Sequence, residues 1–496
     1  MGLTYQSTRG GESGVTASMA ILQGLAKDGG LFMPAEIPKL DVPFEVLAGM
    51  TYQETAYEVM KLFLTDFTEE ELKSCIDRAY DGKFDTEEIA PLAKADGAYY
   101  LELYHGSTIA FKDMALSILP HLMTTSARKN KADKEIVILT ATSGDTGKAA
   151  MAGFADVPGT RIIVFYPKNG VSKVQELQMR TQKGDNTSVV AIHGNFDDAQ
   201  TGVKNIFGNR ALEEEMASAG FQFSSANSIN IGRLVPQVVY YVYAYAKLLA
   251  NQEIGQGEEI NVVVPTGNFG NILAAYFAKK WAFLSRPWYA LPMTTRYCTI
   301  FCYRNLRQEA GIYPYQFPVH GHPYIQQFRA SYLPERRLRS GSQRSLMKEL
   351  AEKGSYTVTP AMREFMSDFT GGFATEAENA AVIKQIFEDT GYLVDTHTGV
   401  AAAVYKGYKA LTGDGAKTVI ASTASPYKFS HSVMEAIAGS ESLEGRDEFQ
   451  VVDELSRLTG TPVPGAVEEI RNAPVRHNLE CGVDKMEETV KNILGI

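Results

Sequence analysis

Short, apolar, β-branched runs alternate with helical patterns along much of this chain, and this alternation limits the folds it can adopt. EIVILTAT, TRIIVFYP and TSVVAIHG each precede a segment with apolar residues at helical spacing. The same order returns where INVVVPTG precedes ILAAYFAKK and where KTVIAST precedes HSVMEAIAG. Buried strands that are joined through helices indicate a mostly parallel sheet with helices on both faces. We therefore predict an α/β fold with central, mostly parallel sheets.

The length of the chain, 496 residues, predicts more than one hydrophobic core. Residues 50–80 carry apolar positions at helical spacing and are predicted to form two helices, before the alternating pattern begins near residue 96. We expect an N-terminal domain over 1–95, a catalytic region of two α/β subdomains over 96–480, and a C-terminal helix over 481–496.

Charge and cysteine content narrow the class of protein. The net charge is −10, which argues against nucleic acid as the main partner. No apolar run reaches the roughly 18 residues of a membrane-spanning helix, and MGLTYQSTRGG has no apolar signal-peptide core. Four cysteines without a metal-binding pattern fit a reducing compartment. We expect a cytoplasmic protein that binds neither nucleic acid nor membrane.

Two glycine-rich loops follow predicted strands, where ligands bind in parallel-sheet proteins. TSGDTGKAA spans 142–150, and PTGNFGN spans 265–271 ahead of a predicted helix. Convergent backbone amides and a helix N-terminus cradle a phosphate without any cation. Taken alone, each loop is as easily a tight turn. The second loop lacks the lysine of a Walker A motif and the full GxGxxG pattern, so nucleotide binding is the weaker prediction.

A lone lysine, Lys112, stands in the apolar segment HGSTIAFKDMA. Most lysines lie on the solvated surface, but a lysine in a pocket can lose its proton and attack a carbonyl carbon. Two further segments are candidates for binding: Thr423 follows the predicted strand KTVIAS, and NSINIGRLVPQ begins a predicted helix at 227–237. Taken alone, the second is more simply a capped helix start, and His105 is as easily a structural histidine.

Seven motifs in this order resemble the threonine synthase family of fold-type II pyridoxal-phosphate enzymes. They are YQSTRG, GLAKDGGLFMP, HGSTIAFKD, ATSGDTG, NSINIGR, PTGNFGN and STASPYKF. The resemblance covers roughly residues 5–280 and 346–430, and Ser107 stands where the family usually has proline. It implies a tryptophan synthase β-like fold, pyridoxal 5′-phosphate as the cofactor, no metal, and a monomer.

The resemblance also implies a role for individual residues. Lys112 is the residue that bonds to the cofactor and then moves protons, Thr423 faces the pyridine nitrogen, and Asp145 lies near the ring hydroxyl. The implied loop around the cofactor phosphate consists of Gly267, Asn268, Phe269, Gly270 and Asn271. The implied substrate-binding residues are Ser143, Gly144 and Thr146 for the carboxylate, and Asn230 and Arg233 for the phosphate.

The implied reaction converts O-phospho-L-homoserine and water to L-threonine and phosphate by γ-elimination and β-addition of water. Three other interpretations stay open: a related lyase such as a threonine dehydratase, an inactive member of the family, and a nucleotide-binding regulator. The N-terminal YQSTRG and DGGLFMP segments, together with HGSTIAFKD, favour threonine synthase, because related lyases lack them in this form.

Residues 281–345 differ in character from both flanks. These 65 residues hold nine arginines and two glutamates but no lysine and no aspartate, a net charge of +7 in a chain of net charge −10. Parts of the stretch, translated in shifted reading frames, can spell segments similar to the family's. We interpret it as frameshifted, with a genuine insertion as the alternative. On this interpretation Cys298, Cys302, His320 and His322 form no metal site, and irregular packing is expected.

Overall fold

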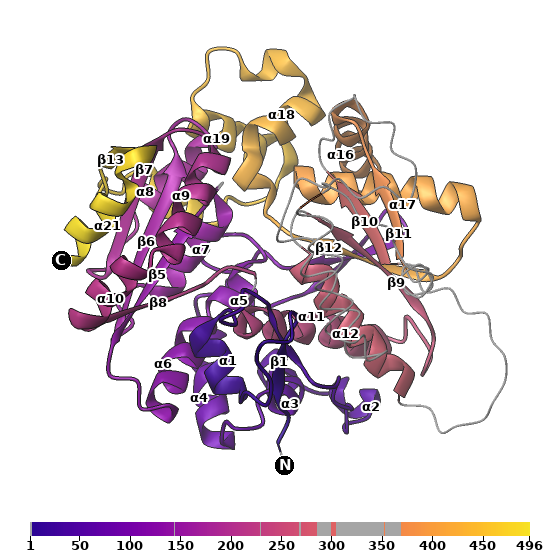
Figure 1. The fold of residues 1–496 in the computed structure, drawn as a ribbon. Helices are drawn as coiled ribbons and strands as arrows, with labels where there is room; N and C mark the ends of the chain where they lie inside the picture. Colours follow the sequence, from indigo (N-terminus) through magenta and orange to yellow (C-terminus); the bar gives the residue numbers. More distant parts are fainter. Residues whose placement is uncertain are drawn as a thin grey trace.

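Two mostly parallel sheets form the frame of the protein (Figure 1). The computed structural model describes residues 2–142, 144–228, 230–266, 269–284, 299–303, 352 and 369–496. The six-stranded sheet has the spatial order β11 (Phe369–Phe373), β10 (Thr299–Tyr303), β9 (Ile260–Pro265), β12 (Lys417–Ser422), β4 (Ala98–Glu102) and β3 (Leu92–Ala95). The five-stranded sheet has the order β13 (Leu479–Gly482), β7 (Thr187–His193), β6 (Thr160–Pro167), β5 (Glu135–Ala141) and β8 (Phe221–Ser224).

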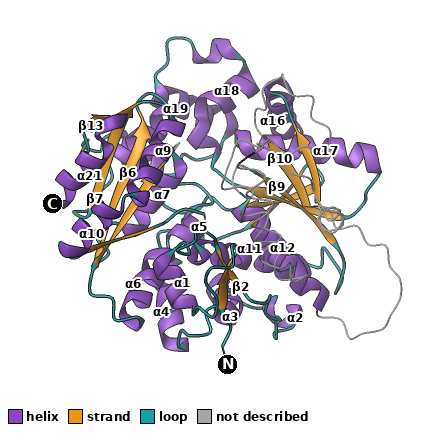
Figure 2. Cartoon of the chain, in the orientation of Figure 1, coloured by secondary structure: helices purple, strands orange, loops and turns teal. Residues whose placement is uncertain are grey.

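All strand pairs in these two sheets are parallel except β3 with β4. Each apolar run that the sequence predicted to be a strand forms one, and the predicted helices follow the strands. Parallel strands need a crossover that returns the chain to the same end of the sheet, and helices provide it here. Figure 2 shows the two sheets as separate groups of strands with helices around them.

The helices around the five-stranded sheet come from the middle of the chain and from its end. They are α7 (Asp145–Phe154), α8 (Lys173–Arg180), α9 (Phe196–Gly208), α10 (Arg210–Ser218) and α21 (Met486–Leu494). Residues of α9 and α21 share one apolar core with β5, β6 and β7. Because β13 pairs with β7 and α21 packs on α9, the C-terminal segment completes this sheet (Figure 1). The predicted domain boundaries remain predictions.

A second set of helices covers the six-stranded sheet. They are α12 (Gly270–Leu284), α16 (Glu376–Thr390), α17 (Thr396–Thr412), α18 (Ser430–Ala438), α19 (Glu448–Thr459) and α20 (Gly465–Arg471). The C-terminal part of the chain also contains the 3₁₀ turns η1 (Pro426–Phe429), η2 (Ser440–Leu443) and η3 (Val483–Lys485). Apolar residues of α16, α17, α18 and α19 form one core with Tyr100, Val263 and Ile420 of the sheet.

The N-terminal segment packs below both sheets in Figure 1. Its elements are β1 (Tyr5–Ser7), α1 (Ala17–Gln23), β2 (Phe32–Pro34), α2 (Phe44–Leu47), α3 (Tyr52–Phe63) and α4 (Glu69–Ala79). They pack with α5 (Asp113–Leu116), α6 (Leu119–Lys129) and α11 (Ile231–Ala250). The two helices predicted over 50–80 are α3 and α4, and a threonine with a glutamate three residues later caps each.

Two parts of the unusual stretch 281–345 belong to this frame. Trp281 lies in α12 and is 1% exposed; its indole Nε1 donates to the carbonyl of Pro38 over 2.5 Å, and its ring lies 5.4 Å from that of Phe63. Strand β10 pairs with β9 on one side and β11 on the other. The expectation of irregular packing is therefore wrong for Trp281 and for the backbone of β10. The residues of the stretch beyond α12 and β10, among them Cys298, His320 and His322, lie outside the described residues.

Among the described residues, no helix is long and apolar enough to cross a membrane.

Candidate active site

The site lies where the loops after β4, β5 and β12 meet. The loop after β4 leads to Lys112 and α5, and the loop after β5 leads to Asp145, the first residue of α7. Ligands bind at the carboxyl ends of parallel strands because the connecting loops converge there. The distance of 3.3 Å between Lys112 Nζ and Asp145 Oδ2 confirms that residues from separate sheets meet at one place.

Backbone hydrogen bonds join the Lys112 segment to the residues that follow β12. The amide of Phe111 donates to the carbonyl of Thr423 over 2.8 Å, and the amide of Ser425 donates to the carbonyl of Ile109 over 3.0 Å. Ile109 itself has φ of +51°, which is unfavourable for a β-branched residue and is held here by its neighbours. The backbone that leads into Lys112 is therefore held in place before any ligand binds.

Three charged side chains, two cationic and one anionic, meet in this site. Asp145 Oδ2 lies 3.3 Å from Lys112 Nζ, and Asp145 Oδ1 lies 3.2 Å from Lys428 Nζ. The Lys428 side chain is fully buried, whereas those of Lys112 and Asp145 are 18% and 15% exposed. Gln175 Nε2, from α8, also donates to Asp145 Oδ1 over 2.7 Å. One carboxylate is thus shared by two ammonium groups and one amide.

The surroundings of Lys112 favour its neutral amine. Burial lowers the pKa of Lys112, Asp145 opposes this effect, and the charges of Lys428 and Arg233 add to it. The ammonium also lies 4.7 Å from the centre of the Phe111 ring. The neutral amine is the form of lysine that attacks a carbonyl carbon and accepts protons, and a lowered pKa increases the fraction of that form at a given pH.

Asp145 stays ionised although it is largely buried. Burial alone would raise the pKa of Asp145, but Lys428, Lys112 and His397 hold it below its ordinary value, and the bond from Gln175 lowers it further. His397 is itself oriented by Asp395, which accepts from its Nδ1 over 2.8 Å. The site therefore keeps a fixed anion next to Lys112 across the physiological pH range.

The loop between β5 and α7 requires a glycine at 144. Gly144 has φ of +129° and ψ of −77°, and a Cβ there would lie 2.5 Å from the side chain of Gln175. The glycine therefore allows Gln175 to reach Asp145. Thr146 lies in the first turn of α7 and is partly exposed. Ser143, the third residue predicted for this loop, lies outside the described residues.

The loop after β9 offers a buried, unpaired donor. Asn271 lies at the start of α12, and its Oδ1 accepts from Tyr240 over 2.5 Å and from Tyr241 over 2.6 Å, while its Nδ2 has no partner within the described structure. A buried donor without a partner is costly unless a ligand uses it. Phe269 and Gly270 are buried beside it, and Gly267 and Asn268 lie outside the described residues. A helix N-terminus with this donor suits a phosphate.

Arg233 brings an uncompensated cation to the site. It is 1% exposed, and its Nη1 donates to the carbonyl of Ala226 over 3.0 Å, while Nε has no partner within the described structure. No described carboxylate forms an ion pair with it, and burial lowers the pKa of Arg233 to about 10. A buried guanidinium without an acid partner is expensive in an empty protein and suits an anionic ligand.

Asn230 has a structural use. Its Oδ1 accepts from the amide of Gly232 over 2.8 Å and caps α11, and its Nδ2 donates to the carbonyls of Ile21 and Ser225, both over 3.0 Å. Both donor hydrogens are engaged, so a substrate phosphate would have to displace one of these bonds. Thr423 differs, because its hydroxyl makes no hydrogen bond to any described residue and is available to a ligand.

The structure adds Lys428, Gln175 and His397 to the residues that the sequence singled out. Lys428 lies in the motif STASPYKF, five residues after Thr423, and this membership is the only signal of its role in the sequence. Gln175 and His397 carry no comparable signal. Gln175 lies on α8, and its contact with Asp145 depends on how α8 packs against α7.

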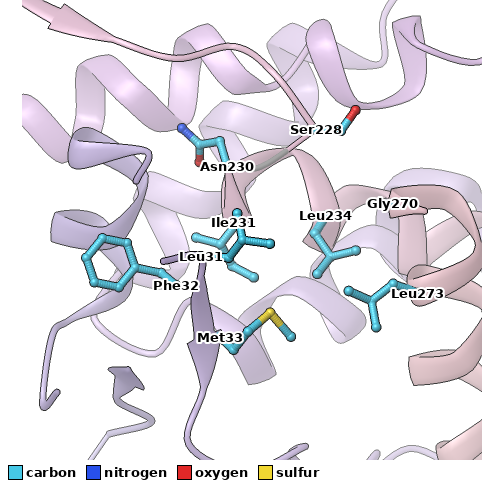
Figure 3. Close-up of a pocket in the computed structure, with 9 residues that line it drawn as sticks. All are labelled: Leu31, Phe32, Met33, Ser228, Asn230, Ile231, Leu234, Gly270 and Leu273. Carbon is cyan, nitrogen blue, oxygen red and sulfur yellow. The ribbon is translucent and has the colours of Figure 1, made fainter. Parts of the chain in front are cut away.

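A small apolar pocket lies behind the N-termini of α11 and α12 (Figure 3). It is lined by Leu31, Phe32, Met33, Ser228, Asn230, Ile231, Leu234, Gly270 and Leu273. In Figure 3 the side chains of Met33, Leu234 and Leu273 gather at its centre. Its lining is unsuited to an anion, and it shows how the N-terminal strand β2 packs against the two helices that present Arg233 and Asn271.

Comparison with known proteins agrees with this geometry. The family model "Threonine synthase N terminus" matches residues 4–80. Threonine synthase of Schizosaccharomyces pombe is 33% identical over 477 residues, covering 88% of this chain and 90% of that protein. Human threonine synthase-like 1 is 34% identical over 440 residues, covering 85% of this chain, which spans only 58% of that longer protein.

Solved structures of threonine synthases have the same fold. The yeast enzyme superposes with a TM-score of 0.80 at 26% identity, covering 99% of this chain and 98% of that one. The pyridoxal-phosphate-bound threonine synthase from Brucella melitensis gives 0.78 at 27% identity, again covering 99% and 98%. The predicted fold class, a fold-type II arrangement of two mostly parallel sheets, is confirmed. The chain belongs to the threonine synthase family.

Proposed function

We propose that the protein is a pyridoxal-phosphate-dependent threonine synthase that converts O-phospho-L-homoserine and water to L-threonine and phosphate. The observation that carries this proposal is Lys112, whose amine is largely buried, has a lowered pKa, and lies 3.3 Å from a fixed carboxylate at the junction of the two sheets. Family membership and the pyridoxal phosphate in the Brucella relative support the choice of cofactor.

The described residues suit that cofactor in three ways. Lys112 would bond to its aldehyde, the unpaired Nδ2 of Asn271 and the α12 N-terminus would hold its phosphate, and the free hydroxyl of Thr423 would face its pyridine nitrogen. Gly267 and Asn268 complete the proposed phosphate loop, and Asp145 is proposed near the ring hydroxyl. Bound at this place, pyridoxal phosphate supplies an electron sink for negative charge on the substrate's carbon atoms.

The chain's own groups carry out binding and proton transfer. The neutral amine of Lys112 removes the proton from the α carbon of the substrate, and its flexible stem lets it serve the neighbouring β carbon. Arg233 is proposed to bind the substrate phosphate, which leaves the γ carbon. The loop with Ser143, Gly144 and Thr146 is proposed to bind the substrate carboxylate.

The charges in the site match these ligands. Lys112 and Lys428 share the carboxylate of Asp145, and Arg233, whose charge acts on Lys112, has no acidic partner among the described residues, so the protein alone is short of negative charge here. Phosphate and carboxylate groups of cofactor and substrate would offset the excess. Anions bound by fixed donors in a water-poor site are held far more tightly than in bulk water.

We also infer that the protein acts as a monomer in the cytoplasm, with the small-molecule substrate as its main partner. Cys75 and Cys481 are free thiols, which is typical of proteins from a reducing compartment. The monomer follows from the resemblance to the longer members of the family. Size-exclusion chromatography with light scattering tests it, and a mass of twice 54.4 kDa would contradict it.

The first experiment is an absorption spectrum of the purified protein with added pyridoxal phosphate, before and after borohydride. The wild type is expected to show a band near the border of the visible and ultraviolet that borohydride removes, and Lys112→Ala is expected to lack it. Release of phosphate and formation of threonine from O-phosphohomoserine then test the reaction. Threonine consumption with formation of a keto acid would favour a dehydratase, and a band without any turnover would indicate an inactive family member.

A further inference from the structure

Lys428 is a buried lysine for which the proposed reaction gives no role. Its side chain is fully buried, and its ammonium donates to the carbonyl of Thr108 over 2.8 Å and lies 3.2 Å from Asp145 Oδ1. Lysine is rarely buried to this extent unless it is paired. Here the pairing is to a carboxylate that Lys112 already contacts through its other oxygen, at 3.3 Å.

The position of Asp145 explains why a second cation is needed. Alone, Asp145 would form a simple ion pair with Lys112 and hold that lysine in its charged form, because an opposite charge within a few ångströms favours the ionised state. The same carboxylate begins the helix α7, next to the loop proposed to bind the substrate carboxylate. A cation on Oδ1 of Asp145 offsets the negative charge that would keep Lys112 protonated and that would repel the substrate carboxylate.

The other charged groups around this pair are few. Arg233 and Lys428 act on Lys112 as like charges; His397, Lys112 and Lys428 act on Asp145 as opposite charges. Around Lys428 itself lie Asp145 and Asp113, and Asp113 accepts from the amide and hydroxyl of Thr108. Lys148 also faces Lys428, but its ammonium donates to Gln182 and it forms no ion pair with Asp145.

We propose that Lys428 is a positioning residue for Lys112: it holds Oδ1 of the Asp145 carboxylate and offsets its charge, so that Lys112 presents a neutral amine near physiological pH. The inference rests on the proposed function, because a neutral amine matters only if Lys112 attacks an aldehyde and moves protons. It acts through Asp145 and touches no substrate. The lowered pKa of Lys112, to which Lys428 contributes, agrees with it.

The test measures the protonation of Lys112 directly, without cofactor. The full-length protein is labelled with a trace of acetic anhydride at a series of pH values, and acetylation of Lys112 is followed by mass spectrometry of its peptide. The pH of half-maximal labelling reports the amine's protonation, and the limiting rate at high pH reports its accessibility. In Lys428→Gln, which keeps a donor for the Thr108 carbonyl but removes the charge, the half-maximal pH should rise and labelling at pH 8 should slow several-fold.

Two controls separate this role from a merely structural one. Lys148→Gln removes the charge of another buried lysine on α7 that does not contact Asp145, so the half-maximal pH of Lys112 should stay at the wild-type value. In the Asp145→Asn background, Lys428→Gln should shift that pH less than in the wild type, because the shared carboxylate is gone and only the direct repulsion between the two ammonium groups is left to remove. A shift of the same size in both backgrounds would overturn the role of Asp145.

A folded Lys428→Gln protein whose half-maximal pH equals that of the wild type would overturn the proposal, even if its limiting rate changed. Folding is checked by circular dichroism. Should Lys428→Gln not fold, Lys428→Arg replaces it. Because arginine keeps the positive charge, the proposal requires that the half-maximal pH for labelling of Lys112 stay at the wild-type value. A rise in that pH would count against the proposal. The labelling needs no cofactor, so failure of the proposed function, seen as a missing absorption band, is a separate result.

Discussion

The six-stranded and five-stranded sheets contribute opposite charges to one site. Loops after β4 and β12 of the six-stranded sheet bring the cations Lys112 and Lys428 and the hydroxyl of Thr423. The loops and helices after β5 and β6 of the five-stranded sheet bring the carboxylate of Asp145 and the amide of Gln175. Neither sheet alone supplies both charges of this group, so the chemistry of the site depends on the two sheets being packed together.

Arg233 belongs to neither sheet. It lies on α11, which connects β8 of the five-stranded sheet to β9 of the six-stranded one. Its guanidinium has no acidic partner among the described residues, unlike the two lysines. The site thus combines two lysines that share the carboxylate of Asp145 with a guanidinium that has no described acidic partner and is suited to an anionic ligand.

The largest effect is expected from removing the link between the sheets. Asp145→Asn leaves two buried ammonium groups without their carboxylate and should lower the free energy of unfolding by about 3 kcal/mol at pH 7.5. Since the pKa of Asp145 is held below its ordinary value, its contribution is complete above about pH 4 and is lost as pH falls through the pKa of the folded state.

Urea unfolding of both proteins at pH 7.5 checks this prediction. Asp77→Asn is the matched control, because Asp77 is exposed on α4 and should change the free energy of unfolding by less than about 0.5 kcal/mol. If Asp145→Asn is no less stable than this control, the carboxylate does not hold the two sheets together.

An intermediate effect, on binding and not on stability, is expected from Arg233. Arg233→Met removes this guanidinium, so the substrate concentration for half-maximal rate should rise roughly tenfold to a hundredfold, the value of a charge-assisted hydrogen bond. The free energy of unfolding should stay the same or increase, because an uncompensated buried charge is gone. Steady-state kinetics and urea unfolding of the same variant check both parts. Loss of stability without a change in substrate dependence would assign Arg233 a structural role.

The smallest effect is expected from substituting two histidines, one near each sheet, and measuring stability at two pH values. Burial alone would lower the pKa of His105, but Glu102 and Asp85, at 2.8 and 2.5 Å, raise it. A raised pKa means that the contribution of His105 to stability is complete below pH 6.5 and is lost as pH rises through the pKa of the folded state. His105→Asn should therefore lower the free energy of unfolding by about 1 kcal/mol at pH 5.5 and by less at pH 8.5.

His477, beside the five-stranded sheet, should show the opposite trend. Burial lowers its pKa, and its Nε2 lies 3.0 Å from the carbonyl of Gln182. The contribution of His477 to stability is complete above pH 6.5 and is lost as pH falls through the pKa of the folded state. His477→Asn should therefore lower the free energy of unfolding less at pH 5.5 than at pH 8.5. Unfolding curves of both variants at both pH values are the measurement, and slopes of the same sign would contradict the assignment.

Most strands and helices could be predicted from the sequence because their signals are local. An apolar β-branched run such as EIVILTA forms β5, and threonine caps begin α3 and α4, since these patterns depend on neighbours along the chain. Lys112 was predicted as reactive because a lysine in an apolar segment is unusual. Asn230 shows the limit of motif membership: its position suggested ligand binding, whereas the folded chain uses its amide to cap α11 and to bind two carbonyls.

The alternation of strands and helices, the glycine-rich loops at strand ends, and the family motifs that locate Lys112 and Thr423 can all be recognised in the sequence alone. That Lys112 and Lys428, more than 300 residues apart, share the carboxylate of Asp145 is seen only in the folded chain. The two kinds of feature depend on forces of different range along the chain. Helix and strand signals act over a few residues, whereas the charge state of a buried amine depends on every group within several ångströms, whichever part of the chain supplies it.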